Sequence, residues 1–249
     1  MRNKRRLVVI VFAVAMLVAA LLYNTARPNT ATAPKSSSQA SQTNPQATPT
    51  QAAVPSFDKA QFSTTDPASI WVIVNKKHPL NPKNYAPNDL VNVGGGQYLR
   101  ASAAKGFTAM AADAKTAGLV ITPASGYRSY DTQVTVYNNE VKTNGQAVAD
   151  SQSARPGYSE HQTGLAMDIA GGGCSIEDCF GSTPQGKWVA ANAYKYGFIM
   201  RYTPEDTAVT GYRAESWHFR YVGIELATEM HNSGIATLEQ FFGVSGGGY

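Results

Sequence analysis

Apolar and polar residues recur with two different periods between residues 100 and 232, and these periods predict helices and strands. In residues 100–117, Ala104, Phe107, Ala111 and Ala114 fall at helical spacing, and a glycine follows at position 118. Short apolar runs predict strands elsewhere. Helices are expected at residues 100–117, 131–144, 184–196 and 224–232, and strands at residues 119–122, 165–169, 198–202 and 217–222.

These elements are interleaved without a regular strand–helix–strand rhythm, which favours an α+β fold with a small mixed or antiparallel sheet. Asp131 is the expected cap of the second helix. Strand alternation places Asp168 on the face opposite Met167, and His218 on the face opposite Trp217. Strict alternation also separates Glu215 from His218, so a bend or bulge at the residue between Glu215 and Trp217 is needed for the two side chains to meet.

The first residues carry a different pattern. Residues 1–24 contain a basic stub and an unbroken apolar run, which is typical of a signal anchor or a signal peptide. We favour an uncleaved anchor. Residues 25–55 are rich in Ser, Thr, Pro, Ala and Gln and poor in large apolar residues, which predicts a disordered tether. Residues 56–249 have the length of one globular domain, expected to be extracytoplasmic and tethered to the cell membrane, or secreted if the segment is cleaved.

Charge and cysteine content narrow the picture further. The net charge of +4 is mild and much of the excess lies in the N-terminal stub, so nucleic-acid binding is not expected. Nothing in the sequence suggests more than a monomer. Cys174 and Cys179 are the only two cysteines, and outside the cytoplasm such a close pair indicates a disulfide that closes a small loop. The alternative is a metal site with two thiolates.

Two segments carry the candidate chemistry, and they include two of the 4 histidines. The first holds His161 and Asp168, and the second holds Glu215 and His218. Taken singly, each residue has an ordinary explanation: a surface histidine, a capping aspartate, or a polar residue on an aromatic core strand. Together they supply three ligands at metal-binding spacing and a carboxylate beside them, which is the inventory of a catalytic zinc site.

The pattern Ser159-x-His161-x6-Asp168, followed by Glu215-x-Trp217-His218, resembles the signature of the VanY-type zinc D,D-carboxypeptidases. These belong with the lysostaphin, D-Ala-D-Ala peptidase and N-terminal Hedgehog group, so the resemblance implies that group's α+β fold. It spans residues 73–242. Further matching segments, in the same order as in the family, are residues 125–129 with Gln133, 197–202, 210–212 and 219–223.

The resemblance implies a role for each matching residue. His161, Asp168 and His218 would bind one zinc ion, with Glu215 as the catalytic base. Arg128 matches the arginine that binds the carbonyl or carboxylate region of the substrate. Ser159 and Gln133 match positions that line the pocket for the terminal D-residue. Tyr127 and Tyr158 flank candidate site residues in the sequence, so they are expected in the pocket wall, as is Trp217.

The chain departs from the family pattern at two places. Ser216 stands where the family often has proline, which could loosen the placement of the neighbouring glutamate. The glycine run at residues 171–173 and the cysteine loop after it look like a local elaboration at the rim of the pocket.

The expected function is zinc-dependent removal of the C-terminal D-alanine from peptidoglycan stem peptides. Two alternatives remain open: an L,D-carboxypeptidase acting on tetrapeptide stems, and a zinc-bearing cell-wall-binding module without turnover. The expected partners are stem peptides and, through the N-terminal segment, the membrane.

Overall fold

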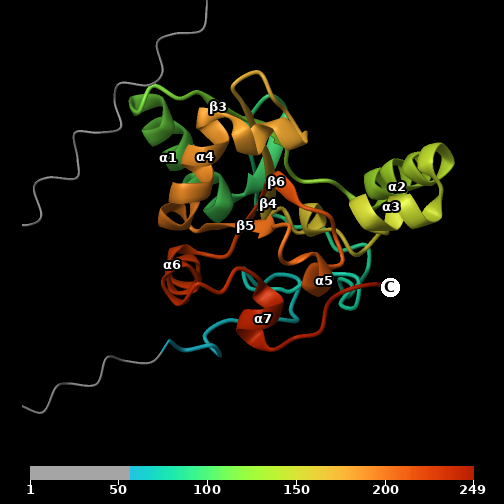
Figure 1. The fold of residues 1–249 in the computed structure, drawn as a ribbon. Helices are drawn as coiled ribbons and strands as arrows, with labels where there is room; N and C mark the ends of the chain where they lie inside the picture. Colours follow the sequence, from blue (N-terminus) through green and yellow to red (C-terminus); the bar gives the residue numbers. More distant parts are fainter. Residues whose placement is uncertain (1–56) are drawn as a thin grey trace, which may run out of the picture. The chain divides into compact units, whose positions relative to one another are not determined.

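The computed structural model describes residues 57–249 (Figure 1). The expected anchor at residues 1–24 and the expected tether at residues 25–55 lie outside these residues. Within the described part of the chain, no helix combines the length and the apolar character needed to cross a membrane.

Two antiparallel sheets organise the domain. The smaller is a hairpin of β1 (Leu90–Gly94) and β2 (Gln97–Arg100). The larger has four strands in the order β3-β4-β6-β5, and every neighbouring pair is antiparallel. Its strands are β3 (Ile121–Ser125), β4 (Ala166–Gly171), β5 (Phe198–Tyr202) and β6 (Glu215–Tyr221). The expected α+β class is confirmed, and of the two sheet types predicted the antiparallel one is found.

The helices surround this sheet. They are α1 (Ala101–Thr116), α2 (Tyr130–Asn144), α3 (Gln146–Gln152), α4 (Pro184–Asn192), α5 (Thr207–Thr210), α6 (Ile224–Ser233) and α7 (Leu238–Phe242). Three 3-10 turns join them: η1 (Glu160–Thr163), η2 (Asp178–Ser182) and η3 (Ala193–Tyr196). The helix expected at residues 184–196 is therefore divided into α4 and η3.

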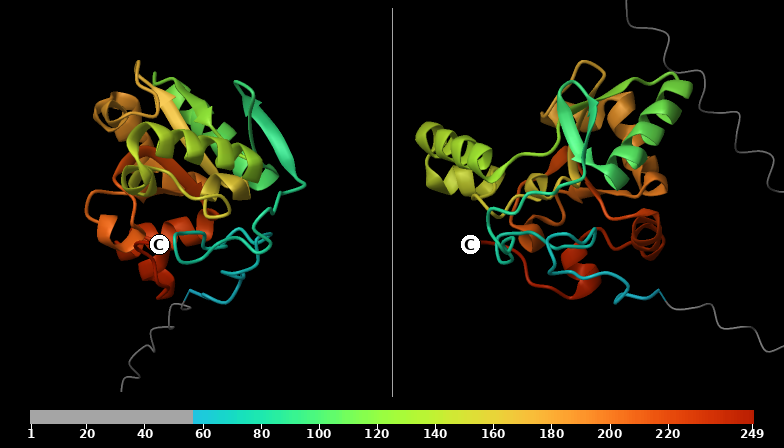
Figure 2. Two further views of the ribbon diagram at one scale, coloured as in Figure 1. Left: turned by 90° about the vertical axis from the view of Figure 1, so that its right-hand side faces the viewer. Right: turned by 180° about the vertical axis from the view of Figure 1, so that it is seen from behind.

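The cap of α2 differs from the prediction. Ser129, not Asp131, is the N-cap, because its Oγ accepts a hydrogen bond from the Thr132 N–H at 3.1 Å. Asp131 lies in the first turn, where a carboxylate is favourable near the positive end of the helix dipole. The helical hairpin of α2 and α3 stands to one side of the sheet (Figures 1 and 2).

The two faces of the four-stranded sheet are chemically different. On one face, Met167, Ile169 and Phe219 join the main hydrophobic core, which α1 and α4 cover (Figure 1). The opposite face carries Asp168 and His218, and these two residues are directly paired across β4 and β6. The predicted alternation is thus confirmed in both strands. A second core, around Trp71, is formed with α6 and α7.

Candidate active site

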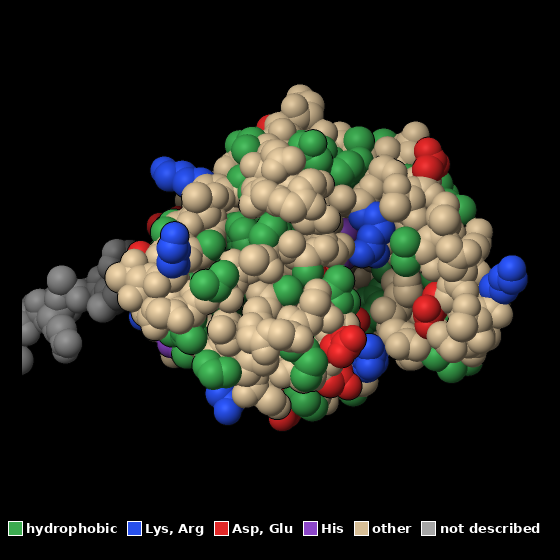
Figure 3. Space-filling model, turned by 90° about the horizontal axis from the view of Figure 1, so that it is seen from above, with side chains coloured by type: hydrophobic (Ala, Val, Ile, Leu, Met, Phe, Trp, Pro, Cys, Tyr) green, Lys and Arg blue, Asp and Glu red, His purple; other side chains and the backbone are tan. Residues whose placement is uncertain are grey.

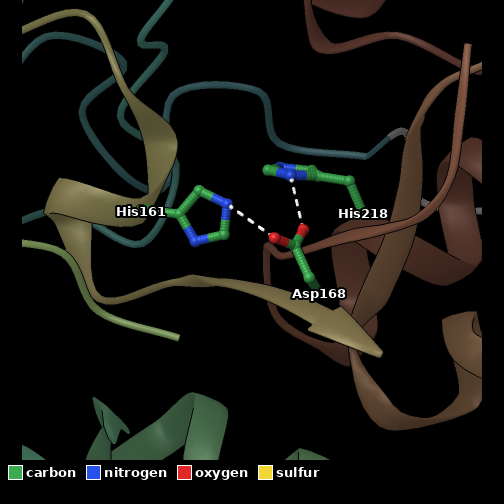
Figure 4. Close-up of side chains that lie close together, drawn as sticks. All are labelled: His161, Asp168 and His218. Atoms are coloured by element: carbon green, nitrogen blue, oxygen red, sulfur yellow. Dashed lines mark ion pairs between the residues drawn. The ribbon is translucent and has the colours of Figure 1, made fainter. Parts of the chain in front are cut away.

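Three side chains converge on the polar face of the sheet (Figure 4). His161 comes from η1, Asp168 from β4 and His218 from β6. His161 Nε2 lies 3.4 Å from Asp168 Oδ2, and His218 Nδ1 lies 3.1 Å from Asp168 Oδ1. All three residues are buried, and their potential ligand atoms lie within 4.8 Å of one another.

The hydrogen bonds of the two histidines fix which nitrogen faces the centre. His161 Nδ1–H donates to the Gly126 carbonyl at 2.8 Å, and His218 Nε2–H donates to Glu160 Oε2 at 3.1 Å. His161 Nε2 and His218 Nδ1 are therefore the nitrogens that face Asp168. The buried Asp168 Oδ1 receives no hydrogen bond. Two imidazole nitrogens and a carboxylate face one another at short distance, and a zinc ion fits that set of ligands.

Burial and neighbouring charges shift the pKa values of all three groups. Burial opposes ionisation of Asp168, but the two histidines outweigh it and hold the pKa of that carboxyl well below its usual range. Burial likewise lowers the pKa of His161. For His218 burial acts in the same direction, yet the neighbouring carboxylates of Asp168 and Glu160 raise its pKa to about 9.

A buried charge network behind His218 was not anticipated from the sequence. Glu160 Oε1 accepts hydrogen bonds from Arg201 Nε at 2.9 Å and from Arg220 Nη1 at 3.0 Å. Arg201 also donates to Glu239 Oε1 at 2.6 Å. Burial alone would raise the pKa of Glu160, but the two guanidinium groups hold it well below its usual range. Glu160 thus stays an anion that orients the imidazole of His218.

Glu215 reaches the same centre through an irregularity in β6. Its carboxylate lies 3.9 Å from His218 Nδ1, although the two residues are three positions apart. The pairing with β5 shifts here, because Met200 pairs with Phe219 but Tyr202 pairs with Glu215. The break in alternation expected near Ser216 is therefore present. Burial raises the pKa of Glu215 to about 7.

Ser216 anchors this part of β6. Its Oγ accepts a hydrogen bond from the Gly181 N–H at 3.0 Å. A proline at this position would offer no such acceptor. The departure from the family pattern therefore ties the strand to η2 and does not leave it loose.

Arg128 is held in place by its neighbours. Its Nη1 donates to Gln133 Oε1 at 3.0 Å and its Nη2 donates to Ser125 Oγ at 3.0 Å. Burial lowers the pKa of the guanidinium. Gln133 is only 1% exposed and its Nε2 donates to the Ala154 carbonyl at 2.7 Å. Gln133 is therefore a buried residue that positions Arg128.

The converging residues open into a cavity of about 240 Å³. Figure 3 shows a hollow beside the α2–α3 hairpin, with basic side chains next to it. Ser159 and Trp217 line the cavity as expected, and so do Tyr202, Tyr212 and Arg213, which received no role from the sequence. The full lining consists of Arg128, Gln133, Val136, Glu140, Gln152, Ser153, Ala154, Ser159, Glu160, His161, Asp168, Ile176, Tyr202, Tyr212, Arg213, Glu215, Trp217 and His218.

Tyr127 and Tyr158 do not line the cavity, in contrast to the prediction. Neighbouring side chains of an extended segment point in opposite directions, so residues next to Arg128 and Ser159 face elsewhere. The ring of Tyr158 packs edge-on against Tyr249, with centroids 5.3 Å apart. Closeness in sequence to a site residue was a poor guide here.

Cys174 and Cys179 form a disulfide, with their Cα atoms 5.9 Å apart. Because the two sulfurs are bonded to each other, neither is a free thiolate for the alternative two-thiolate metal site. Of the other two histidines, His78 contacts Ser245 at 3.2 Å and the His231 ring stacks on Tyr194, so both have structural partners away from the cavity.

An α+β fold with three buried potential metal ligands and a glutamate beside them has the arrangement of a metal-dependent hydrolase. A model of the VanY family, described as D-alanyl-D-alanine carboxypeptidase, matches residues 96–224. This range contains the three potential metal ligands and Glu215. The chain is 43% identical to YodJ of Bacillus subtilis, named provisionally as a carboxypeptidase, over 71% of this chain and 68% of the relative. The chain belongs to the VanY family of D-alanyl-D-alanine carboxypeptidases, and the resemblance seen in the motifs is confirmed.

Several solved structures are also similar. The LdcB LD-carboxypeptidase has a TM-score of 0.66 and 42% identity, covering 72% of this chain and 88% of its own. A variant of the D,D-pentapeptidase VanY from a VanB-type resistance cassette, in complex with Zn(II), has a TM-score of 0.61 and 30% identity, covering 69% and 97%. A structure of VanYB holds D-alanine-D-alanine.

Proposed function

We propose that the protein is a zinc-dependent carboxypeptidase that removes the C-terminal D-alanine from peptidoglycan stem peptides. The observation that carries the proposal is the buried His161–Asp168–His218 donor set with Glu215 3.9 Å from His218, inside a cavity. The zinc-bound VanY structure and the VanYB complex with D-alanine-D-alanine support the metal and the substrate class.

The proposed roles follow from the positions of the groups. His161 Nε2, Asp168 and His218 Nδ1 would hold one zinc ion. When bound, such an ion lowers the pKa of a water molecule and polarises the scissile carbonyl. The Glu215 carboxylate accepts the proton of the attacking water and delivers it to the leaving amine.

Arg128 supplies a fixed positive charge. Gln133 and Ser125 each accept one of its hydrogen bonds, so the guanidinium cannot swing away from the cavity. It can pair with the carboxylate of the terminal residue or stabilise the oxyanion of the tetrahedral intermediate. Ser159, buried in the cavity wall, offers a hydroxyl donor to the same substrate end.

An L,D-carboxypeptidase acting on tetrapeptide stems is the second candidate. The observation in its favour is the higher identity to the LdcB LD-carboxypeptidase, 42%, than to the VanY D,D-pentapeptidase, 30%. Both candidates use the same donor set and base, so the substrate's length and the configuration of its penultimate residue distinguish them.

We further propose that the domain works outside the cytoplasm as a monomer, held near the membrane by the apolar run within residues 1–24 and reaching its substrate through the tether at residues 25–55. The sequence of these two segments supports this arrangement. Protease protection in membrane vesicles would test it, since the domain should be digested only from the outer side.

The activity is tested by mass spectrometry of synthetic stem peptides after incubation with the full chain, with and without chelator. Loss of one D-alanine from a pentapeptide ending in D-Ala-D-Ala, blocked by chelator and restored by zinc, is the expected result. Cleavage only of a tetrapeptide ending in one D-alanine would transfer the assignment to the L,D type. Zinc binding with no cleavage of either peptide would contradict both and favour a binding module.

A further inference from the structure

The disulfide loop, residues 172–181, follows β4 directly and is firmly attached to the domain. Cys174 is buried in the main core and exchanges two backbone hydrogen bonds with Gly171, at 3.0 and 3.2 Å. At its other end, the Gly181 N–H donates to Ser216 Oγ, next to Glu215. The Cys174–Cys179 bond closes the loop between these attachments. Ile176 lies within the closed segment, so its backbone has little freedom.

Ile176 has an unusual backbone conformation. Its φ is +43°, and among residues 57–249 it is the only residue other than glycine with a positive φ. This region is sterically disfavoured for any side chain, and more so for a β-branched one. Burial does not compensate, because the side chain is 43% exposed. Strained backbone conformations cluster at functional sites, so an exposed residue in such a conformation is a reason to look for a function.

The side chain of Ile176 lines the same cavity as the metal donors and Glu215. Its exposure places it at the mouth of that cavity and not at the closed end. A carboxypeptidase binds the end of its substrate inside the cavity, so the rest of the peptide must leave through the mouth. An apolar group at the mouth therefore faces the residues that precede the scissile bond.

On the basis of the proposed function, we propose that Ile176, held in place by the Cys174–Cys179 disulfide, contacts the stem peptide on the N-terminal side of the scissile bond and is a specificity-determining residue. It packs on the aliphatic parts of the upstream residues. It makes no contact with the residue that is removed, which lies deeper in the cavity, beside Arg128 and Ser159. The disulfide loop is thereby the part of the cavity that distinguishes a stem peptide from a short dipeptide.

The test compares two variants on two substrates. Ile176→Ala and Ile176→Gly are assayed on the stem peptide that the wild type cleaves, and on an N-acetylated analogue of its last two residues. For the stem peptide, loss of the apolar contact should raise KM roughly 3- to 10-fold with kcat within about twofold. The short analogue should keep its wild-type KM, because it does not reach the mouth.

Ile176→Gly adds a readout that a purely structural role would not produce. Glycine accepts a positive φ without strain, so this variant should have a Tm equal to or above that of the wild type while its KM for the stem peptide rises. The matched control is Ile224→Ala, since Ile224 is an isoleucine 58% exposed at the start of α6 and outside the cavity lining. If both Ile176 variants match this control on the stem peptide, the inference is overturned.

The role of the disulfide is tested by the double change Cys174→Ala and Cys179→Ala. It should raise KM for the stem peptide by the same factor as Ile176→Ala, and adding Ile176→Ala should give no further increase. An unchanged KM with normal metal content would remove the disulfide from the proposal. If the wild type neither binds nor cleaves stem peptides, the proposed function fails and this inference with it. If the wild type acts on them and the variants do not differ, only this inference fails.

Discussion

The two faces of the four-stranded sheet share the same strands but have opposite compositions. Met167 and Phe219 point into the main core, whereas their neighbours Asp168 and His218 point into the cavity. Adjacent residues of each strand therefore serve different purposes: one packs in the core and the next belongs to the candidate active site. The apolar face is stabilised by removal of surface from water, and the polar face is tolerated only because each buried charge has a partner. Changes on the two faces should have different consequences.

The largest expected effect comes from Glu215→Ala. Hydrolysis should fall by a factor of about 10³ or more, because the group that moves the proton is lost, while the metal donors remain. Turnover and metal content measured on the same sample check this. Glu205→Ala, an exposed glutamate outside the cavity, is the matched control and should behave as the wild type. Full activity in Glu215→Ala would remove Glu215 from its role as base.

A pair of variants compares the faces directly. Glu160→Gln leaves Arg201 and Arg220 buried without their shared anion, and should lower the free energy of unfolding by about 3–5 kcal/mol. Phe107→Ala in the core beneath the other face should cost a similar amount, about 3–5 kcal/mol. Only Glu160→Gln should also weaken metal binding, by about 10- to 100-fold. Denaturant unfolding and a metal-competition titration measure the two quantities. An equal loss of metal affinity in both variants would show that the faces are not independent.

The metal-free protein should show a pH dependence that Glu215→Gln removes. The pKa of Glu215 is raised from 4.5 to about 7 in the folded state, so between these values the native protein retains a proton that the unfolded chain has lost. Stability from this group is present below pH 4.5 and is lost as the pH rises through 7. Relative to the wild type, Glu215→Gln should gain up to about 3 kcal/mol above neutral pH and nothing at low pH. A constant difference across the pH range would contradict the assignment.

The smallest effect on stability is expected from an exposed ion pair at the rim of the cavity. Asp178→Asn breaks the ion pair in which Asp178 Oδ1 lies 3.9 Å from Arg213 Nη1. The side chain of Asp178 is 79% exposed and that of Arg213 is 47% exposed. The free energy of unfolding should change by less than about 0.5 kcal/mol, because solvent screens such a pair. Thermal unfolding is sufficient to measure this. A loss of several kcal/mol would mean that the rim is as tightly coupled to the fold as the polar face.

The sequence predicted the centre of the site better than its surroundings. Alternation within a strand is a local property, so the orientations of Asp168 and His218 could be inferred from neighbouring residues. The break in β6 could also be inferred, since Glu215 otherwise points away. Glu160 could not be assigned, because its partners Arg201 and Arg220 come from strands 41 and 60 residues away. The available signal was the presence of Arg201 and Arg220 inside mostly apolar strands.

Other differences have similar physical causes. The cap of α2 depends on which residue is the last in extended conformation, and both Ser129 and Asp131 are suitable side chains. Gln133 was placed in the pocket, but its role in holding Arg128 depends on the packing of α2. The positive φ of Ile176 occurs inside the loop that the disulfide closes, and no composition signal marks it.

The enclosure of the Glu160 network has a consequence for the response to dissolved ions. The side chains of Glu160, Arg201 and Arg220 have no solvent exposure, whereas those of Arg155 and Asp150 are 35% and 23% exposed. Mobile ions screen charges over about 8–10 Å at ordinary salt concentrations, but only where water can carry them. The orientation of His218 should therefore be insensitive to ionic strength, and the geometry of the candidate metal ligands should be the same at low and at high salt concentration.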